Sequence, residues 1–414
     1  MSATGYRALD ACVHCGFCLQ SCPTYLVTGD ESDSPRGRIV LMQGLERGDL
    51  TPDDAALRTH LDRCLGCRGC EPVCPSGVGY GTALEAARHE LTAARPMPWM
   101  ARLVLTVFAE PVLRIPALWL ARIARVLAPL FAGGSRLGFA WGMLDATRPA
   151  RGRARGRAPV RADGPATIVF QGCVMAGLFG HVNAATARVL EANGCRTVAA
   201  PGQGCCGALH LHAGAHDDAL ALARANVRAF AAHPDAAIVV NSAGCGAALK
   251  AYGELLADDP LAPAARTMSA RVQDVAETLA ARGPRQGAPL DASVAYDPPC
   301  HLLHAQRVSA PVEMVLRAIP GLRRVAHAEA ALCCGSAGIY SLVEPVLSRD
   351  VLARKVVALF DADPDIVATG NPGCIMQVGA GLRAIGMDTP VVHPVELLDA
   401  SYERAGYYGG VSRV

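Results

Sequence analysis

The 414-residue chain has almost no net charge. Its 39 Lys and Arg residues against 37 Asp and Glu residues leave a formal charge of +2. Such a balance gives no electrostatic reason to expect a nucleic-acid partner or a strongly steered acidic ligand. Apolar residues make up 51% of the chain, which excludes a disordered polyelectrolyte, and the length favours two to three globular domains.

Three kinds of segment are also missing. The first residues, MSATGYRALDAC, show no basic start followed by an apolar core, so we expect no signal peptide and a reducing, cytoplasmic environment. The sequence contains no run of 18 or more uncharged apolar residues, so we expect no transmembrane helix. No glycine-rich dinucleotide fingerprint is present, because GAGLRAIG at 379–386 lacks the strand and acidic residue that such a site needs.

Cysteine is abundant, with 17 residues. In a reducing compartment, clustered cysteines are more often metal ligands than disulfides. Residues 12–23 read CVHCGFCLQSCP, and residues 64–75 read CLGCRGCEPVCP. Both runs separate their cysteines by two, two and three residues and end in proline, which is the spacing of bacterial two-cluster ferredoxins.

In this pattern three cysteines of a run bind one cluster and the fourth binds the other. The spacing predicts one [4Fe–4S] cluster on Cys12, Cys15, Cys18 and Cys74, and a second on Cys22, Cys64, Cys67 and Cys70. Zinc sites also use paired cysteines, but this doubled run is poor zinc spacing. Fully ligated clusters carry single electrons, so we expect this part of the chain to conduct electrons and to transform no substrate.

The C-terminal half is an internal repeat. TIVFQGC (167–173), GQGCCGALH (202–210) and AAIVVNSAGC (236–245) return as SVAYDPPC (293–300), ALCCGSAG (331–338) and DIVATGNPGC (365–374). Equivalent cysteines are displaced by 127, 128 and 129 positions. Alternating strands and helices at this length predict two α/β domains with largely parallel sheets, whose cysteines lie where strands end.

Each repeat carries four thiols. They are Cys173, Cys205, Cys206 and Cys245 in the first copy, and Cys300, Cys333, Cys334 and Cys374 in the second. Three interpretations stay open for them: a further iron–sulfur cluster, a structural zinc ion or structural thiols, and a redox-active dithiol. We predict no ligand role for the nearby histidines, which are His210, His212, His301 and His304.

The predicted fold class is α+β / α/β: a helical two-[4Fe–4S] ferredoxin-like domain followed by two repeated α/β cysteine-rich domains. The predicted divisions are 1–95 for the helical domain, 96–146 for an apolar helical connector, 147–165 for an arginine-rich linker, and 166–285 and 286–414 for the repeats. Ser34 with Pro35 and Thr51 with Pro52 predict helix starts in the first domain. The connector is predicted to form two or three helices. These helices pack between the N-terminal module and the repeats, pack under a partner subunit, or lie on a membrane surface.

The order of these motifs, together with SPRGRI at 34–39 and LCCGSAGIY at 332–340, resembles the iron–sulfur subunits of bacterial glycolate oxidase over essentially the whole chain. The C…CCG…C units are similar to the cysteine-rich domain of heterodisulfide reductases. That domain often ends in C-x-x-C, and Ser242 and Asn371 replace the first cysteine of the pair here.

The resemblance implies partner subunits that bear FAD and oxidise glycolate to glyoxylate. It further implies that this chain passes their electrons towards a quinone or another membrane acceptor, either in the cytoplasm or peripherally on the cytoplasmic face of the inner membrane. The alternative is the iron–sulfur subunit of a related complex, namely a glycerol-3-phosphate or lactate dehydrogenase or a heterodisulfide or thiol reductase.

Overall fold

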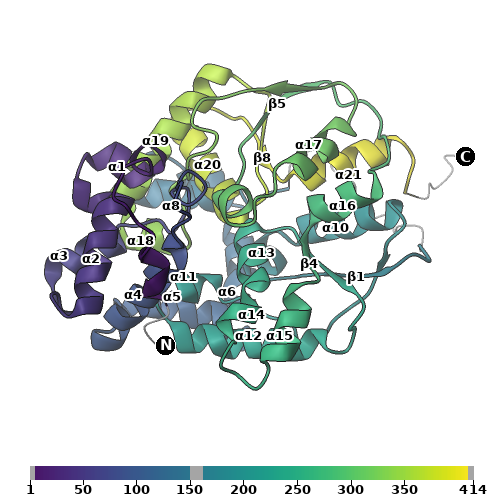
Figure 1. Cartoon of the computed structure of the whole chain (residues 1–414). Helices are drawn as coiled ribbons and strands as arrows, with labels where there is room; N and C mark the ends of the chain where they lie inside the picture. Colours follow the sequence, from purple (N-terminus) through teal and green to yellow (C-terminus); the bar gives the residue numbers. More distant parts are fainter. Residues whose placement is uncertain (1–4, 150–161, 409–414) are drawn as a thin grey trace, which may run out of the picture.

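The structure is a computed structural model that describes residues 5–149 and 162–408. A helical N-terminal module, a helical connector and two α/β units of the same topology follow one another along the chain (Figure 1). This architecture is the predicted fold class. Residues 150–161 of the predicted arginine-rich linker lie outside the described residues.

The N-terminal module consists of short helices and cysteine-bearing loops. Its elements are η1 (Tyr6–Leu9), η2 (Leu19–Ser21), α1 (Pro23–Thr28), η3 (Glu31–Asp33), α2 (Pro35–Arg47), α3 (Ala55–Asp62) and α4 (Tyr80–Ala94). Helix α2 begins where the sequence predicts, because the Ser34 hydroxyl accepts a hydrogen bond from the Gly37 amide at 2.9 Å. The core of the module is formed by apolar residues of α2, α3 and α4, with Cys64 and Cys70 among them.

The second predicted helix start, at Thr51 and Pro52, is wrong. Helix α3 begins later, at Ala55, and its N-cap is Asp54. The Asp54 carboxylate accepts hydrogen bonds from the amides at positions 56 and 57, at 2.9 and 3.0 Å. A charged carboxylate that reaches two amides is a stronger cap than a threonine hydroxyl.

The first repeat is a four-stranded parallel sheet with strand order β2-β1-β3-β4. Its elements are β1 (Ala166–Val169), α9 (Val174–Leu178), α10 (Gly180–Ala192), β2 (Arg196–Thr197), α11 (Ala208–His212), α12 (His216–Phe230), β3 (Ala237–Val240), α13 (Ala243–Lys250), α14 (Tyr252–Leu255), α15 (Ala262–Ser269), β4 (Val272–Asp274) and α16 (Val275–Arg282).

The second repeat has the equivalent order β6-β5-β7-β8, again with parallel pairing throughout. Its elements are β5 (Ala292–Tyr296), η4 (His301–Ala305), α17 (Ala310–Arg317), β6 (Leu322–Val325), α18 (Tyr340–Val343), α19 (Pro345–Ala362), β7 (Ile366–Ala368), α20 (Pro372–Ala384), β8 (Val391–Val392) and α21 (Pro394–Arg404). In both sheets the chain leaves the central strand towards one edge and returns to its other side. Sheets of this kind bind ligands at the carboxyl ends of the two strands where the direction changes.

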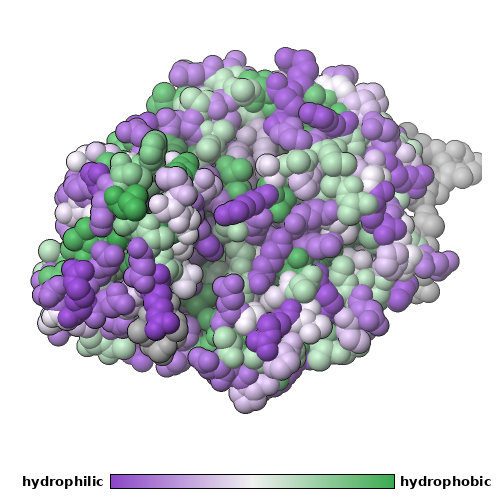
Figure 2. Space-filling model, in the orientation of Figure 1, coloured by the Kyte–Doolittle hydropathy of each residue, from purple (hydrophilic) through white to green (hydrophobic). Residues whose placement is uncertain are grey.

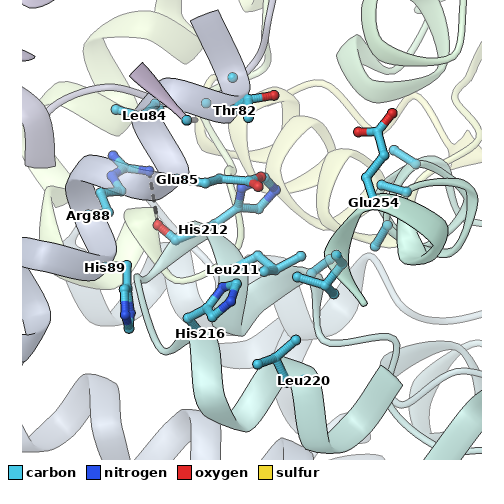
Figure 3. Close-up of a pocket in the computed structure, with 18 of the residues that line it drawn as sticks. Thr82, Leu84, Glu85, Arg88, His89, Leu211, His212, His216, Leu220 and Glu254 are labelled. Atoms are coloured by element: carbon cyan, nitrogen blue, oxygen red, sulfur yellow. Dashed lines mark hydrogen bonds between the residues drawn. The ribbon is translucent and has the colours of Figure 1, made fainter. Parts of the chain in front are cut away.

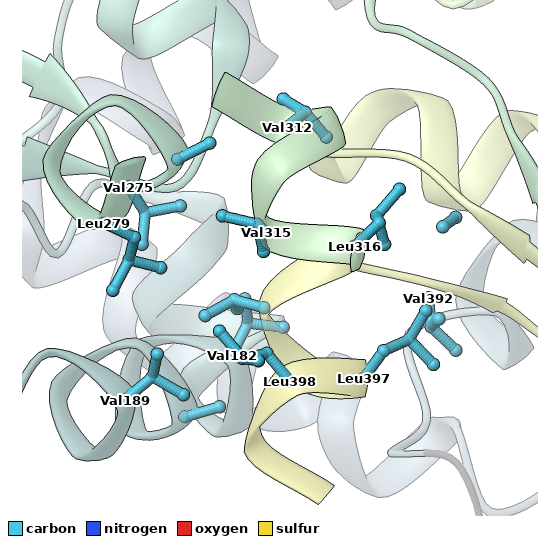
Figure 4. Packing of buried hydrophobic residues seen from close by; sticks show 14 of the residues in the cluster. Val182, Val189, Val275, Leu279, Val312, Val315, Leu316, Val392, Leu397 and Leu398 are labelled. Carbon is cyan, nitrogen blue, oxygen red and sulfur yellow. The ribbon is translucent and has the colours of Figure 1, made fainter. Parts of the chain in front are cut away.

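The two repeats share one hydrophobic core. Helices α10 and α16 of the first repeat pack against α17 and α21 of the second, and Val182, Leu279, Val315 and Leu398 meet at the centre (Figure 4). Residues from both repeats therefore exclude water from a single interface, which fixes the two sheets relative to each other.

The connector contains four helices, which is more than the two or three predicted. They are α5 (Trp99–Ala109), α6 (Pro111–Ala124), α7 (Ala128–Phe131) and α8 (Arg136–Asp145). Helix α6 packs against α9 of the first repeat, and α8 packs against α20 of the second. That the connector packs between the N-terminal module and the repeats, or under a partner subunit, stays a prediction, and its outer side is widely exposed. The exposed large apolar side chains here are Trp99, Met100, Leu103, Val112, Leu113, Ile115, Trp119, Leu120, Ile123, Val126, Leu127, Leu130, Phe131 and Leu137.

Among the described residues no single helix is long and apolar enough to cross a bilayer. Helices α5 and α6 together reach the required length and hydropathy, but they meet at an angle of 100°.

Candidate metal centres

The first predicted ligand set surrounds one small cavity at the start of α2. Cys12, Cys15, Cys18 and Cys74 all line it. Ile39, Val78 and Tyr80 close the same cavity. Four thiols converging on an apolar space fit a metal group that needs four thiolates and little water.

Both cysteine runs use the same unusual backbone around their central cysteine. His14 and Gly16 flank Cys15 with φ angles of 54° and 85°. In the second run, the two residues flanking Cys67 have φ angles of 61° and 60°. Left-handed backbone is unfavourable for a residue with a side chain such as His14. The left-handed residues on both sides of the central cysteine turn each loop sharply, which brings the first three thiols of the run towards one another.

The second predicted ligand set is also brought together. Cys22, Cys64 and Cys70 are buried, and Cys67 lies close enough to interact electrostatically with the other three. The Cys64 sulfur accepts hydrogen bonds from the Gly66 amide at 3.4 Å and from the Tyr80 hydroxyl at 3.5 Å. Because Cys70 also lines the cavity of the first set, the two sets are neighbours.

A buried arginine, which the sequence reasoning missed, lies beside the second set. Arg38 Nη1 is 3.9 Å from the Cys22 sulfur, and Arg38 Nη2 is 3.3 Å from an Asp33 carboxylate oxygen. Burial alone would raise the pKa of the Cys64 thiol, but Arg38 and Arg88 more than offset it and hold that pKa below its usual range. A nearby cation stabilises the thiolate, which is the form that binds iron. Arg38 belongs to the segment SPRGRI, which was the only signal that pointed to it.

The first repeat gathers its four thiols at the carboxyl ends of β1 and β3. The Cys206 and Cys245 sulfurs are 3.2 Å apart, and Cys173 contacts Cys205. The pKa of the Cys205 thiol is lowered by the neighbouring Cys173 and Cys206 thiols and, to a smaller extent, by the His210 side chain. None of the four histidines was predicted to contact a thiol, so His210 is a second feature that only the structure provides.

The second repeat gathers its thiols at the equivalent place, after β5 and β7. The Cys334 and Cys374 sulfurs are 3.3 Å apart, and those of Cys300 and Cys333 are 3.9 Å apart. His301 Nδ1 lies 3.5 Å from the Cys300 sulfur. Four thiols in a buried group fit a metal centre in this repeat as well.

The two positions that replace a cysteine face each other across the repeats. The Asn371 side-chain oxygen lies 3.4 Å from the Ser242 hydroxyl and 3.3 Å from the Gly244 amide. The Asn371 amide nitrogen donates to the Cys374 sulfur at 3.5 Å. The departure from C-x-x-C therefore joins the repeats through a polar contact.

The N-terminal module contacts the second repeat at its thiols. Cys67 and Cys300 are partly buried and pack against the same buried cluster, which includes Leu65 and Cys333, and Cys300 acts on the pKa of Cys67. The Tyr340 hydroxyl donates to the Arg63 carbonyl at 2.9 Å and fixes this junction. The second ligand set and the thiols of the second repeat thus adjoin without an intervening domain.

The N-terminal module and the first repeat enclose a larger cavity of about 600 Å³. It lies between α4 and helices α11 to α14 (Figure 3). In Figure 2 the surface is hollowed between the module and the repeats, and part of the floor of the hollow is hydrophobic.

Two family models match this arrangement. The 4Fe-4S dicluster domain matches residues 8–78, and the cysteine-rich domain matches twice, at 167–250 and 294–379. The fold, the thiol geometry and these matches define an iron–sulfur protein that works in electron transfer.

Curated relatives narrow the class. The chain is 37% identical over 415 residues to the glycolate oxidase iron-sulfur subunit of Escherichia coli (strain K12), covering 96% of this chain and 95% of the relative. It is 35% identical over 424 residues to a probable glycolate oxidase iron-sulfur subunit of Bacillus subtilis (strain 168), covering 96% and 94%. The chain belongs to the family of glycolate oxidase iron–sulfur subunits, and it serves in electron transfer within a complex of several subunits.

Two more distant likenesses exist. A subunit of the fumarate reductase (CoM/CoB) of Methanothermobacter marburgensis is 27% identical over 410 residues, which cover 96% of this chain and 73% of that protein. A crystal structure of a hypothetical protein from Helicobacter pylori superposes with a TM-score of 0.54 at 11% identity, over 100% of this chain and 77% of that one. This second likeness shows the fold alone.

Proposed function

We propose that this chain conducts electrons from flavin-bearing partner subunits, which oxidise glycolate to glyoxylate, towards a quinone. The names of the two relatives above 30% identity support glycolate as the substrate of the complex. The sequence contains no dinucleotide fingerprint, which supports a flavin carried by a partner subunit.

Two clusters of the N-terminal module are assigned to the predicted residues. Cys12, Cys15, Cys18 and Cys74 hold one, and Cys22, Cys64, Cys67 and Cys70 hold the other. A [4Fe–4S] cluster supplies a store for one electron at a time. The chain's own contribution is to exclude water, to fix the thiolates and to place Arg38 where it offsets negative charge. We assign the repeats to residues 166–285 and 286–414.

The observation that carries the proposal is that Cys67 and Cys300 pack against the same buried cluster and interact electrostatically. This packing joins the N-terminal module to the second repeat through ligand-bearing side chains. A further iron–sulfur cluster in the second repeat is therefore the interpretation we favour over zinc or free thiols. Iron near eight atoms per chain would limit the chain to two cubanes, whereas about twelve would support a third.

The test uses the native complex, purified anaerobically with its partners. Cys67→Ser is expected to remove one paramagnetic signal and to stop quinone reduction, while direct dye reduction at the flavin subunit continues. Cys195→Ser is the matched control, because Cys195 is the one cysteine outside the four sets and is buried in the first repeat. Full quinone reduction by Cys67→Ser would contradict the proposal.

We further propose that the connector lies on the cytoplasmic face of the inner membrane. More than half of the exposed large apolar side chains among the described residues lie between residues 99 and 137. The same stretch carries exposed Arg102, Arg122 and Arg136, and Glu110 is its one acidic residue. Tryptophan, apolar and arginine side chains on one surface match an anionic lipid interface.

Vesicle flotation tests whether a lipid surface or a protein partner covers the connector. The purified chain is expected to float with anionic vesicles at low salt, less well with neutral vesicles, and poorly after Trp99→Ser and Trp119→Ser together. Leu342→Ser, at an exposed position of the second repeat, is the control. Flotation that is absent at low salt would assign the surface to a partner subunit instead.

A further inference from the structure

The cavity of about 600 Å³ reaches three of the four thiol sites. Its lining includes Gly66, which lies between two cysteines of the second ligand set, and Gly244, which precedes Cys245. It also includes His301, which follows Cys300. A molecule inside the cavity is therefore next to residues that neighbour the cysteines of three thiol sites.

Part of the cavity wall is apolar. Leu84 comes from α4, Leu211 from α11 and Leu220 from α12, and these three side chains line the space from different helices (Figure 3). Ala248 and Leu255 extend the apolar wall along α13 and α14. Such walls fit a flat ring that is poorly solvated in water.

The three arginines that line the cavity are all engaged. Arg68 pairs with Glu71 at 2.8 Å, and Arg224 pairs with Asp259 at 2.6 Å. Arg88 donates to four main-chain carbonyls, one of which is that of His212 at 2.9 Å. An anionic ligand such as a phosphate or a carboxylate needs an available cation, so this lining favours an uncharged molecule.

The cavity lining also holds polar side chains from both of its walls. Glu85 from α4 and His212 from α11 point into the same part of the cavity (Figure 3). Within the described residues, the Glu85 carboxyl group forms no hydrogen bond or ion pair. Burial raises the pKa of Glu85, and burial together with His301 lowers the pKa of His212. A carboxyl group whose raised pKa favours the protonated form, together with an imidazole whose lowered pKa favours the neutral form, is suited to bind and protonate carbonyl oxygens.

We infer that this cavity binds a quinone head group and is where the quinone becomes hydroquinone, an inference that rests on the proposed electron transfer to quinone. The ring lies between the leucine side chains, one carbonyl oxygen faces Glu85, and the other faces His212. Two electrons arrive singly from the chain's electron-transfer centres. Two protons come from water: Glu85 transfers one and is reprotonated, and His212 relays the other. Each C=O becomes C–OH, so atoms and electrons balance.

The experiment uses the complex purified with its native partners and a short-chain azidoquinone as the photoaffinity probe. Label is expected in peptides of α4 and α11, and unlabelled quinone is expected to displace it. Leu211→Trp, which fills the cavity, should abolish this labelling. Label found only in the connector or in a partner subunit would overturn the inference.

Kinetics give an independent readout. Glu85→Gln is expected to lower the turnover of quinone by roughly 10²-fold, the usual contribution of a general acid. Reduction of the iron–sulfur centres by glycolate, followed by absorbance and paramagnetic resonance, should stay normal. Glu90→Gln is the matched control, because Glu90 lies on the same helix outside the cavity lining.

Two different outcomes would contradict the proposed function and the assignment of the cavity. If the native complex reduces its centres with glycolate but reduces no quinone, the proposed function is wrong. If the native complex reduces quinone and Glu85→Gln turns over normally, only the assignment of the cavity is wrong.

Discussion

The two repeats share a fold and a thiol pattern, but their thiols have different surroundings. Phe170 and Asp297 occupy equivalent positions, each directly after the central strand of its repeat. The Phe170 amide donates to the Val239 carbonyl on β3, and the Asp297 amide donates to the Ala368 carbonyl on β7, both at 2.9 Å. Asp297 forms a buried ion pair with Lys355, whereas the first repeat places neutral Asn226 on the equivalent helix, bound to the Cys205 carbonyl at 2.8 Å.

The two repeats therefore differ in whether charged side chains are buried near their thiols. Burial raises the pKa of Asp297 to about 6, against the opposing effect of Lys355, and the Cys334 and Cys374 thiols lie close enough to act on Lys355. A buried cation reduces the energy needed to hold negative charge nearby. Lys355 therefore places a positive charge near the thiols of the second repeat, which is also the repeat whose Cys300 lies near Cys67 of the N-terminal module. The duplication preserved the fold, while the neighbours of each copy determined its use.

The largest expected effect comes from removing equivalent cysteines. Cys300→Ser is expected to lower electron throughput to quinone by roughly 100-fold or more, since its thiol adjoins Cys67. Cys173→Ser, the matched change in the first repeat, should have a clearly smaller effect. Turnover and iron content of both complexes check this, and equal losses would remove the functional difference between the repeats.

The second largest expected effect is a difference in the loss of unfolding free energy between matched variants of the two repeats. Lys355→Met leaves Asp297 buried without its cation and is expected to cost about 3–5 kcal/mol of unfolding free energy. Asn226→Leu removes hydrogen bonds but strands no charge, so we expect about 1–3 kcal/mol. Urea denaturation of the anaerobically purified chains measures both. A smaller loss for Lys355→Met than for Asn226→Leu would show that the ion pair is dispensable.

The connector offers a comparison of intermediate size, because it meets each repeat at a glycine. A Cβ at Gly177 would lie 2.2 Å from Leu118 Cδ1 and 2.9 Å from Leu118 Cβ, so a rotation of the leucine does not relieve the clash. Gly177→Ala is expected to destabilise the α6–α9 contact by about 1–3 kcal/mol. At Gly142 the nearest atom is 3.2 Å away, and the better helix propensity of alanine offsets the contact. Thermal denaturation should show almost no change for Gly142→Ala.

The smallest expected effect concerns the polar contact between the repeats. Asn371→Ala removes interactions with Ser242, Gly244 and Cys374 and is expected to cost about 1 kcal/mol. Ser242→Ala removes one long hydrogen bond and should cost less. If the two variants are equally stable, Asn371 contributes nothing beyond that hydroxyl contact.

Much of the fold follows from local patterns. The strands at 167, 236, 293 and 365 and the N-cap at Ser34 are confirmed, because short β-branched runs and a capping hydroxyl act over a few residues. The start of α3 was wrong for the same reason: in TPDDAAL two caps compete, and side-chain reach decides between them. The number of connector helices was underestimated, and the hydropathy of the connector does not show what covers its exposed side.

The sequence by itself determined which thiols act together within a loop and that the α/β unit occurs twice, since ligand spacing and strand–helix alternation are properties of neighbouring residues. Only the tertiary structure decided that Cys67 meets Cys300, that Arg38 and Lys355 lie beside thiols, and that Glu85 and His212 share a cavity. These pairs are far apart along the chain. Their contact depends on how helices and sheets pack, which no local spacing encodes.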